Sequence, residues 1–409
     1  MYMKKSVLRN YAKLLATVGI KVKKGQDVII NAGIDQPEFI KTLVEECYKA
    51  GAADVRVEWN YQPLAKVNAK YRSLETMSKV HDWELAKLEH QAKTLPARLH
   101  IVSDDPDGMK GIDQEKLAAA SKARYPVTKP YSDRMKNRQQ WCIAAVPGEA
   151  WARKVFPGLT KNQAVEKLWQ AIIHTSRADN DPIAAWEEHN ADLKKRYDYL
   201  NSLGIVSLEY KSSNGTDFRV GLMPESVFHG GGETTRSGDF FNPNIPSEEV
   251  FTTPKKGQAD GVVYATMPLS YQGELIENFS ITFKDGRACE VHAEKNEELL
   301  KKMINMDEGA AYLGECALVP YTSPINEMGI LFYNTLFDEN ASCHLALGAG
   351  FCDAVRDYEK LTIEECREKG VNDSMIHVDF MIGSADLSIF ANTADGRRIQ
   401  IFKDGVWNF

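Results

Sequence analysis

Histidine and aspartate alternate with apolar residues in the segment Ile376-His-Val-Asp-Phe-Met-Ile382. This alternation predicts a β-strand, in which successive side chains point to opposite faces. His377, Asp379 and Met381 would share one face, while the other face is wholly apolar and belongs to the core. An imidazole beside a carboxylate is suited to binding one metal ion. A hydrogen-bonded His–Asp pair without a metal explains this motif equally well.

A second histidine, His344, follows the acidic segment that begins at Asp338. It starts a strand-like segment in which Ala346 and Gly348 share its face, so small side chains leave space beside the imidazole. Glu339 lies on the approach to this strand. The segment could belong to a metal site, or His344 could be a buried histidine with an exposed glutamate nearby.

Three further glutamates lie in the second half of the chain. Glu315 begins an apolar strand-like segment, where it either reaches water or has a partner such as a metal, because an unpaired buried carboxylate is costly. Glu248 and Glu249 lie between Pro246 and Pro254, in a segment expected to be a rigid extended loop. One of them could point inward and the other into solvent, and composition does not choose between them.

Carboxylates and histidines of this kind suit two divalent ions. Zinc, cobalt or manganese fits a set containing imidazoles better than magnesium does. Two ions about 3.5–4 Å apart activate a bridging water and polarise a carbonyl, which is the chemistry of aminopeptidases.

The first half of the chain alternates helices with strands. Strands are expected at 27–31, 54–59, 98–102 and 141–146, and helices at 3–18, 36–50, about 63–93, 162–176 and 182–203. This order predicts βαβ units and a largely parallel sheet.

Strand-like segments dominate after Gly204. They are expected at 205–210, 217–222, 261–266, 276–283, 290–292, 317–319, 329–332, 344–347, 377–382, 387–390 and 398–402, with helices only at about 295–304 and 362–369. The pattern predicts an antiparallel domain, a barrel or sandwich. We therefore expect an α+β protein with an α/β amino-terminal domain, 1–203, and a β-rich, barrel-like carboxy-terminal domain, 204–409.

Composition excludes several classes of protein. The 409 residues carry a net charge of −7. The protein therefore has no overall positive charge that would attract nucleic acid or an anionic membrane. We expect no membrane helix and no signal peptide. The seven scattered cysteines form no CxxC pair, which favours a reducing cytoplasm over a disulfide framework. GxGxxG, GxSxG and HExxH motifs are absent, so no nucleotide cofactor is expected.

Long motifs resemble the M29 family of metalloaminopeptidases. They are Asn244-Ile-Pro-Ser-x-Glu-Val-Phe-Thr-x-Pro254, Asp338-Glu-Asn-Ala-Ser-x-His-Leu-Ala346, His377-Val-Asp-Phe-Met-Ile-Gly-Ser384, Asp181-Pro-Ile-Ala-Ala-Trp-Glu-Glu188 and the loop 229–234. The likeness covers essentially the whole chain. It implies a homodimer whose carboxy-terminal domain holds two metal ions.

The resemblance also implies the metal ligands. They are Glu249, Glu315, Glu339, His344, His377 and Asp379. Glu249 is selected because the family usually has glycine where Glu248 stands. Glu315 is implied as the ligand that bridges both ions and as a catalytic residue acting on the nucleophilic water.

One position departs from the family pattern. Many members have a tyrosine seven residues after the metal histidine, whereas this chain has Phe351. Phenylalanine cannot donate a hydrogen bond to a developing oxyanion, and such a donor is worth roughly 10²–10³ in rate. Tyr333 and Tyr358 are possible substitutes.

The resemblance implies an aminopeptidase that hydrolyses the first residue from short peptides through a metal-activated water. Two alternatives stay open. One is a metal-dependent hydrolase of another small amide or a dipeptide, which Phe351 motivates. The other is a metal-binding relative without catalysis.

Overall fold

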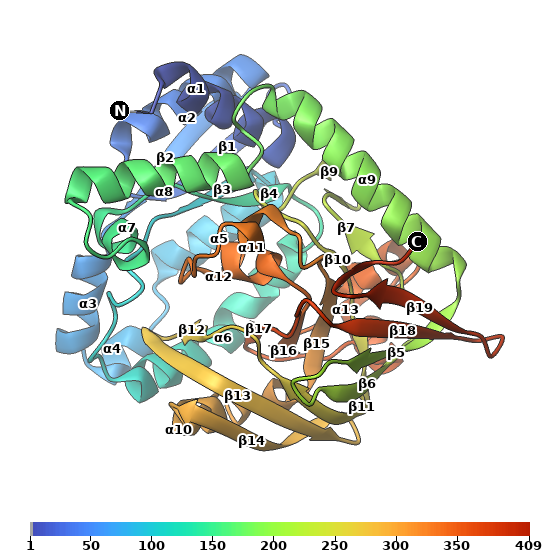
Figure 1. Cartoon of the computed structure of the whole chain (residues 1–409). Helices are drawn as coiled ribbons and strands as arrows, with labels where there is room; N and C mark the ends of the chain where they lie inside the picture. The colour runs from blue at the N-terminus through green and yellow to red at the C-terminus, as the bar shows by residue number, and fades with distance from the viewer. Residues whose placement is uncertain (1–2) are drawn as a thin grey trace. The chain divides into compact units, whose positions relative to one another are not determined.

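The computed structural model describes residues 3–409, which form two compact units (Figure 1). The first contains the chain up to Glu187 together with 232–246, and the second contains 188–231 and 247–409. Helix α9 (Pro182–Ser202) runs from the first into the second. The domain boundary expected at Gly204 stays a prediction.

A four-stranded parallel sheet forms the centre of the first unit. Its strands are β1 (Asp27–Gly33), β2 (Asp54–Asn60), β3 (Ala97–Val102) and β4 (Trp141–Ala145), in the order β2-β1-β3-β4. The apolar residues Val28 and Ile30 of β1 and Leu99 of β3 are fully buried, which explains why these strands lie inside the sheet. The predicted parallel sheet is confirmed.

Helices connect and cover these strands. They are α1 (Lys5–Leu14), continued by a π-helical segment (Leu15–Gly19), α2 (Pro37–Ala50), α3 (Gln62–Tyr71), α4 (Leu74–Ser78), α5 (Asp82–Thr94), α6 (Gln114–Met135), α7 (Glu149–Val155) and α8 (Lys161–Thr175). The two short strands β8 (Glu233–Thr234) and β9 (Phe240–Phe241) pair with each other in this unit.

The structure adds detail to the helices expected in the first unit. The helical region expected over about 63–93 is confirmed and consists of three helices, because Ser73 caps α4 through Thr76 N–H and a capping box of His81 and Glu84 starts α5. Helix α6 was not expected, since its sequence contains Pro126 and Pro130, which ordinarily interrupt a helix.

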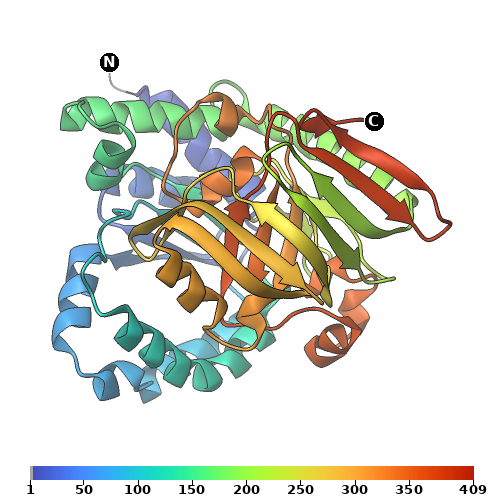
Figure 2. The same cartoon turned by 60° about the horizontal axis from the view of Figure 1, so that its bottom comes forward.

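Antiparallel sheets form most of the second unit (Figure 2). The larger sheet has the order β12-β13-β11-β6-β5-β18-β19-β20, with β14 also paired to β13. Its strands are β5 (Ile205–Lys211), β6 (Asp217–Leu222), β11 (Pro254–Tyr264), β12 (Leu269–Tyr271), β13 (Glu274–Lys284), β14 (Arg287–Lys295), β18 (Ser388–Thr393), β19 (Arg398–Lys403) and β20 (Val406–Trp407).

The smaller sheet has the order β17-β16-β15-β10-β7. Its strands are β7 (His229–Gly230), β10 (Val250–Thr252), β15 (Leu313–Leu318), β16 (His344–Gly348) and β17 (His377–Met381). All its pairings are antiparallel, as the sequence predicted. Closure of the strands into a barrel stays a prediction.

Short helices complete the second unit. They are α10 (Glu297–Ile304), α11 (Pro324–Glu327), α12 (Thr335–Asp338) and α13 (Ile363–Lys369). The strand expected over 329–332 is absent from the described chain. Gly329 and Tyr333 have positive φ angles, of 62° and 56°, so the backbone cannot stay extended there. Within residues 3–409 no helix is both long and apolar enough to cross a membrane.

Candidate metal centre

Three neighbouring strands of the smaller sheet present polar side chains in matched register. Glu315 on β15 lies opposite Ala346 on β16, and Ala346 lies opposite Asp379 on β17. Two residues further along the same pair of strands, His344 lies opposite Met381. The alanine between Glu315 and Asp379 leaves room for both carboxylates, as the small residues of this strand predicted.

His377 joins two of the carboxylates. Its Nε2 lies 3.1 Å from Glu315 Oε2 and 3.3 Å from Asp379 Oδ1. Its Nδ1 lies 2.7 Å from the carbonyl oxygen of Ala349, a contact that places the proton on Nδ1. A backbone carbonyl is the usual partner of a metal-binding histidine, and it leaves Nε2 free to coordinate.

A second group shares Glu315. His344 Nε2 lies 3.2 Å from Glu249 Oε2, and one potential ligand atom from each of Glu249, Glu315 and His344 lies within 4.8 Å of the others. Glu315, His377 and Asp379 meet the same criterion. The Glu315 carboxylate therefore belongs to both groups.

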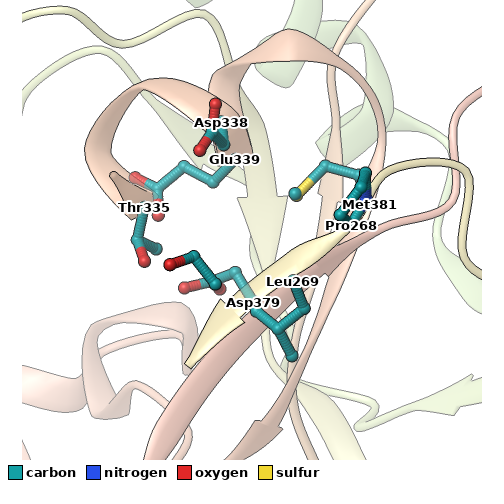
Figure 3. Close-up of a pocket in the computed structure, with 8 residues that line it drawn as sticks. Pro268, Leu269, Thr335, Asp338, Glu339, Asp379 and Met381 are labelled. Atoms are coloured by element: carbon teal, nitrogen blue, oxygen red, sulfur yellow. The ribbon is translucent and has the colours of Figure 1, made fainter. Parts of the chain in front are cut away.

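Glu339 faces the same cluster from a different element. It begins a 3₁₀ turn, Glu339–Ala341, directly after α12. Burial raises its pKa well above the usual value, and Asp379, Glu249 and Glu315 raise it further. Figure 3 shows that Glu339 and Asp379 line the same small pocket. The structure thus brings together all six residues that the resemblance implies as ligands.

The cluster concentrates negative charge in a buried space. Burial raises the pKa of Glu315 to about 7. Burial lowers the pKa of His344, but contact with Glu249 and the nearby carboxylates raise it to about 9. Asp379 Oδ1 is buried and, apart from its 3.3 Å contact with His377 Nε2, makes no hydrogen bond among the described residues. A divalent cation fits this donor set, since it would neutralise the carboxylates and ligate such an oxygen.

Glu248 and Glu249 are both buried, with 5% and 8% of their surfaces exposed. The expectation that one would be solvated is therefore wrong. The loop is held from two sides: His189 Nε2 lies 2.7 Å from the carbonyl oxygen of Ser247, and Glu248 N–H donates to Asn340 at 2.7 Å. Glu249, rather than Glu248, belongs to the group with His344.

Two further residues of this region were missed by the sequence analysis. Asn340 is fully buried, and its Nδ2 donates to the carbonyl oxygen of Leu336 at 3.0 Å and to Glu339 Oε1 at 3.3 Å. Asp338 accepts hydrogen bonds from the backbone N–H groups of Phe332 and Asn334, at 2.8 and 3.0 Å. Both lie in a quoted motif, but a motif does not show which residue is a ligand and which supports one.

Phe351 lies beside the cluster. Its ring centroid is 4.9 Å from that of His377 and 5.5 Å from that of Phe251. Its backbone N–H donates to Thr253 Oγ1 at 2.9 Å. Tyr358, in contrast, packs against an apolar cluster that includes Cys352 and Val355.

A sheet face that gathers carboxylates and imidazoles around a shared glutamate offers the donor set that metal-dependent hydrolases use. Residues 4–407 match the family model described as thermophilic metalloprotease (M29), and the chain belongs to this family of metallopeptidases. The resemblance stated from the motifs is confirmed.

Relatives match over nearly the whole chain. Aminopeptidase AmpS of Bacillus subtilis is 42% identical over 404 residues, and aminopeptidase T of Thermus thermophilus is 38% identical over 402 residues. Each alignment covers 98% of both proteins. The solved structure of wild-type AmpT from Thermus thermophilus has a TM-score of 0.89 at 37% identity and covers 99% of this chain and 100% of that one. Family membership makes this protein a metal-dependent peptidase.

Proposed function

We propose that this protein is an aminopeptidase that removes the first residue from short peptides with the aid of two divalent metal ions. The observation that carries the proposal is the place of Glu315 in both ligand groups. One carboxylate shared by two groups is the arrangement that a two-metal site needs. The relatives, which are named aminopeptidases, support the same activity.

The proposed ligands divide between the two groups. Glu249, Glu315 and His344 would hold one ion, and Glu315, His377 and Asp379 the other. Glu339 would complete the set from the turn that follows α12. Zinc, cobalt or manganese suits these oxygen and imidazole donors better than magnesium. When bound, the ions supply Lewis acidity that polarises a carbonyl and acidifies a water.

The protein's own groups would move the proton. Glu315 is 4% exposed, and its carboxylate would accept the proton of the attacking water. The water oxygen bonds to the scissile carbonyl carbon, the C–N bond breaks, and the proton passes from Glu315 to the leaving amine. The buried carboxylates beside it would bind the free α-amine of the substrate.

Release of the first residue from leucyl peptides tests this proposal. Activity should be lost on treatment with a chelator and restored by zinc, cobalt or manganese, and elemental analysis should find two ions per chain. The Glu315→Gln variant should lose activity. A folded wild-type protein that binds two ions but releases no residue would contradict the proposal.

Phe351 favours a second candidate. Its ring lies against His377 but lacks the hydroxyl that many family members have at this position. This difference motivates a metal-dependent hydrolase of another small amide or of dipeptides as the alternative. Comparison of kcat/KM for leucinamide, dipeptides and longer peptides distinguishes the two, because an aminopeptidase should prefer the longer peptides.

We also propose that the protein is a cytoplasmic homodimer. Large apolar side chains on α3 and α5 are exposed, among them Leu64 at 56%, Tyr71 at 75% and Trp83 at 67%. Such side chains are typical of protein interfaces. Within the described residues all seven cysteines are free, which suits a reducing compartment. Light scattering should give twice the 45.9 kDa of one chain, and Trp83→Lys should shift the protein towards the monomer.

A further inference from the structure

The carbonyl oxygen of Ala349 determines how the ring of His377 is presented. His377 Nδ1 donates to this oxygen at 2.7 Å, which leaves Nε2, the atom beside Glu315 and Asp379, available to bind a metal ion. Ala349 lies directly after the end of β16, where strand pairing no longer fixes the direction of a carbonyl. The groups that hold Ala349 in place therefore belong to the support of the metal centre.

Asn372 holds the backbone on both sides of Ala349. Its side-chain nitrogen donates to the carbonyl oxygen of Gly348 at 2.6 Å, and its backbone carbonyl oxygen accepts the N–H of Gly350 at 2.8 Å. The same side-chain nitrogen also donates to the carbonyl oxygen of Gly309 at 2.8 Å, so Asn372 is itself anchored outside the loop. Asn372 is 2% exposed, and water therefore does not compete for these hydrogen bonds.

One of these contacts sets the direction of the Ala349 carbonyl. The N–H of Gly350 and the carbonyl of Ala349 belong to the same planar, trans peptide unit, so they point in opposite directions. Because the backbone of Asn372 holds this N–H, the carbonyl is directed away from Asn372 and towards His377. The N–H of Ala349 donates to the carbonyl oxygen of Ile376 at 2.7 Å, which fixes the preceding peptide unit beside the strand that carries His377.

Gly314 allows this loop to lie directly against β15. A Cβ atom at position 314 would lie 2.1 Å from the carbonyl oxygen of Ala349 and 2.6 Å from that of Gly348. Both are backbone atoms, so the whole loop would have to move to make room for a side chain. The glycine before Glu315 therefore lets the Ala349 carbonyl reach His377.

We propose that Asn372 is a positioning residue for one of the two metal ions: it directs the Ala349 carbonyl to His377 and so sets the metal affinity of the ligand group that contains His377. The proposal rests on the proposed two-metal function and adds to it a residue outside the six ligands. The Asn372 side chain bonds only to backbone carbonyls among the described residues, and to no ligand. Its effect therefore falls on the ion of the His377 group and not on the ion of the His344 group.

Metal titration tests the proposal first. Asn372→Ala removes both side-chain hydrogen bonds, and loss of such a supporting contact typically lowers metal affinity about 10–100-fold. Calorimetric titration of the metal-free variant with zinc should show this loss for one ion and a wild-type Kd for the other. The His377→Gln variant identifies which step of the titration belongs to the His377 group. Equal weakening of both ions, or of neither, would overturn the proposal.

Asn201 provides a matched control. Its side chain also holds a buried backbone segment of the second unit, since it donates to the carbonyl oxygen of Phe228 at 2.9 Å and accepts the N–H of the same residue at 2.7 Å. Asn201→Ala should lower the melting temperature, as Asn372→Ala does, while both zinc affinities stay at their wild-type values. The same selective loss of one zinc ion in both variants would make general destabilisation the cause and overturn the proposal.

The imidazole proton gives a second readout that needs no catalysis. With isotope-labelled histidine, NMR of the zinc-loaded wild type should show an Nδ1–H signal of His377 that exchanges slowly with water, because this proton is bonded to the Ala349 carbonyl. In Asn372→Ala this proton should exchange about 10-fold faster, since its hydrogen bond is weakened, while the signal of His344 should not change. An unchanged His377 signal would overturn the proposal.

A measurement on the wild type covers the case in which Asn372→Ala does not fold. Linkage is reciprocal, so a loop that sets zinc affinity must itself be stabilised by zinc. Addition of zinc should slow hydrogen exchange at the amides of Ala349 and Gly350 about 10-fold more than at the amide of Phe228. Equal slowing at all three amides would overturn the proposal.

The outcomes also separate this proposal from the proposed function. Selective loss of one zinc ion in Asn372→Ala, together with a wild type that releases no residue from leucyl peptides, would support the role of Asn372 and contradict the aminopeptidase. A wild type that binds two ions and cleaves leucyl peptides, with both ions weakened equally in Asn372→Ala, would leave the aminopeptidase standing and overturn the role of Asn372.

Discussion

The side-chain oxygen of Asn340 accepts the backbone N–H of Glu248 at 2.7 Å, while its nitrogen donates to Glu339 at 3.3 Å. One buried amide therefore joins the loop that carries Glu249 to the turn that carries Glu339. These two proposed ligands lie outside the strands that hold the other four. Asn340 is thus a positioning residue, since it touches the segments that present ligands.

Replacing Asn340 should weaken metal binding. Asn340→Ala removes the contacts to both segments, and loss of such a supporting residue typically costs about 10–100-fold in metal affinity. Titration of the metal-free protein with zinc, followed by calorimetry, measures the change. Asn392→Ala is the control, because Asn392 also bridges two residues, Ser207 and Glu209, within the larger sheet. A lower melting temperature with unchanged metal affinity would show that Asn340 is only structural.

Adding a hydroxyl at position 351 should increase activity. The Phe351 ring already lies 4.9 Å from the His377 ring, so Phe351→Tyr adds one donor beside the cluster with little change of packing. We expect kcat for a leucyl peptide to rise by up to about 10²-fold, with a small change in KM. Phe251→Tyr, on the neighbouring ring, is the control and should not raise kcat. An unchanged kcat in Phe351→Tyr would show that another group already supplies the donor.

Metal removal should lower thermal stability. Glu249, Glu315 and Asp379 are all buried, and a bound cation neutralises charges that otherwise repel one another. At a free metal concentration of 100 times Kd the native state gains about 2.7 kcal/mol, which predicts a melting temperature about 2–5 °C higher than in chelator. Calorimetry with and without zinc measures this shift. The Glu315→Gln variant should show little response to zinc, and a full response would argue against Glu315 as a ligand.

Asp386 should make the second unit sensitive to acid. Its carboxylate accepts hydrogen bonds from Ser212, Ser213 and Ser384, which lower its pKa below the usual value. A pKa that is lower in the folded than in the unfolded protein stabilises the fold above the unfolded value, about 3.9, and this stabilisation disappears as the pH falls below it.

The variant Asp386→Asn isolates this contribution. At pH 7 it should lower the free energy of unfolding by about 1 kcal/mol, a modest value because the carboxylate is exposed. The difference from the wild type should shrink as the pH falls below about 4. Denaturant unfolding across this range measures it. A difference that does not change with pH would mean that the charge of Asp386 is not the cause.

The alternation of side chains along strands and the helical spacing of apolar residues were sufficient to predict much of the secondary structure. Alternation placed His377 and Asp379 on one face of β17, and most of the longer strands lie close to where the sequence predicts them. Capping and proline limited the detail of the prediction: the helical region expected over about 63–93 is divided into three helices, and α6, which contains two prolines, was not predicted. Capping and backbone reversal depend on individual hydrogen bonds and φ angles, which a residue pattern does not specify.

The sequence by itself determined the types of ligand and, through the family motifs, which residues to consider. Tertiary structure decided how they meet: the register that places Ala346 between Glu315 and Asp379, the burial of both Glu248 and Glu249, and the bridge made by Asn340. The physical reason is the range of the interactions. Side-chain alternation along a strand is local, whereas the loop ligands are held by hydrogen bonds between segments far apart in the chain, and these form only in the folded protein.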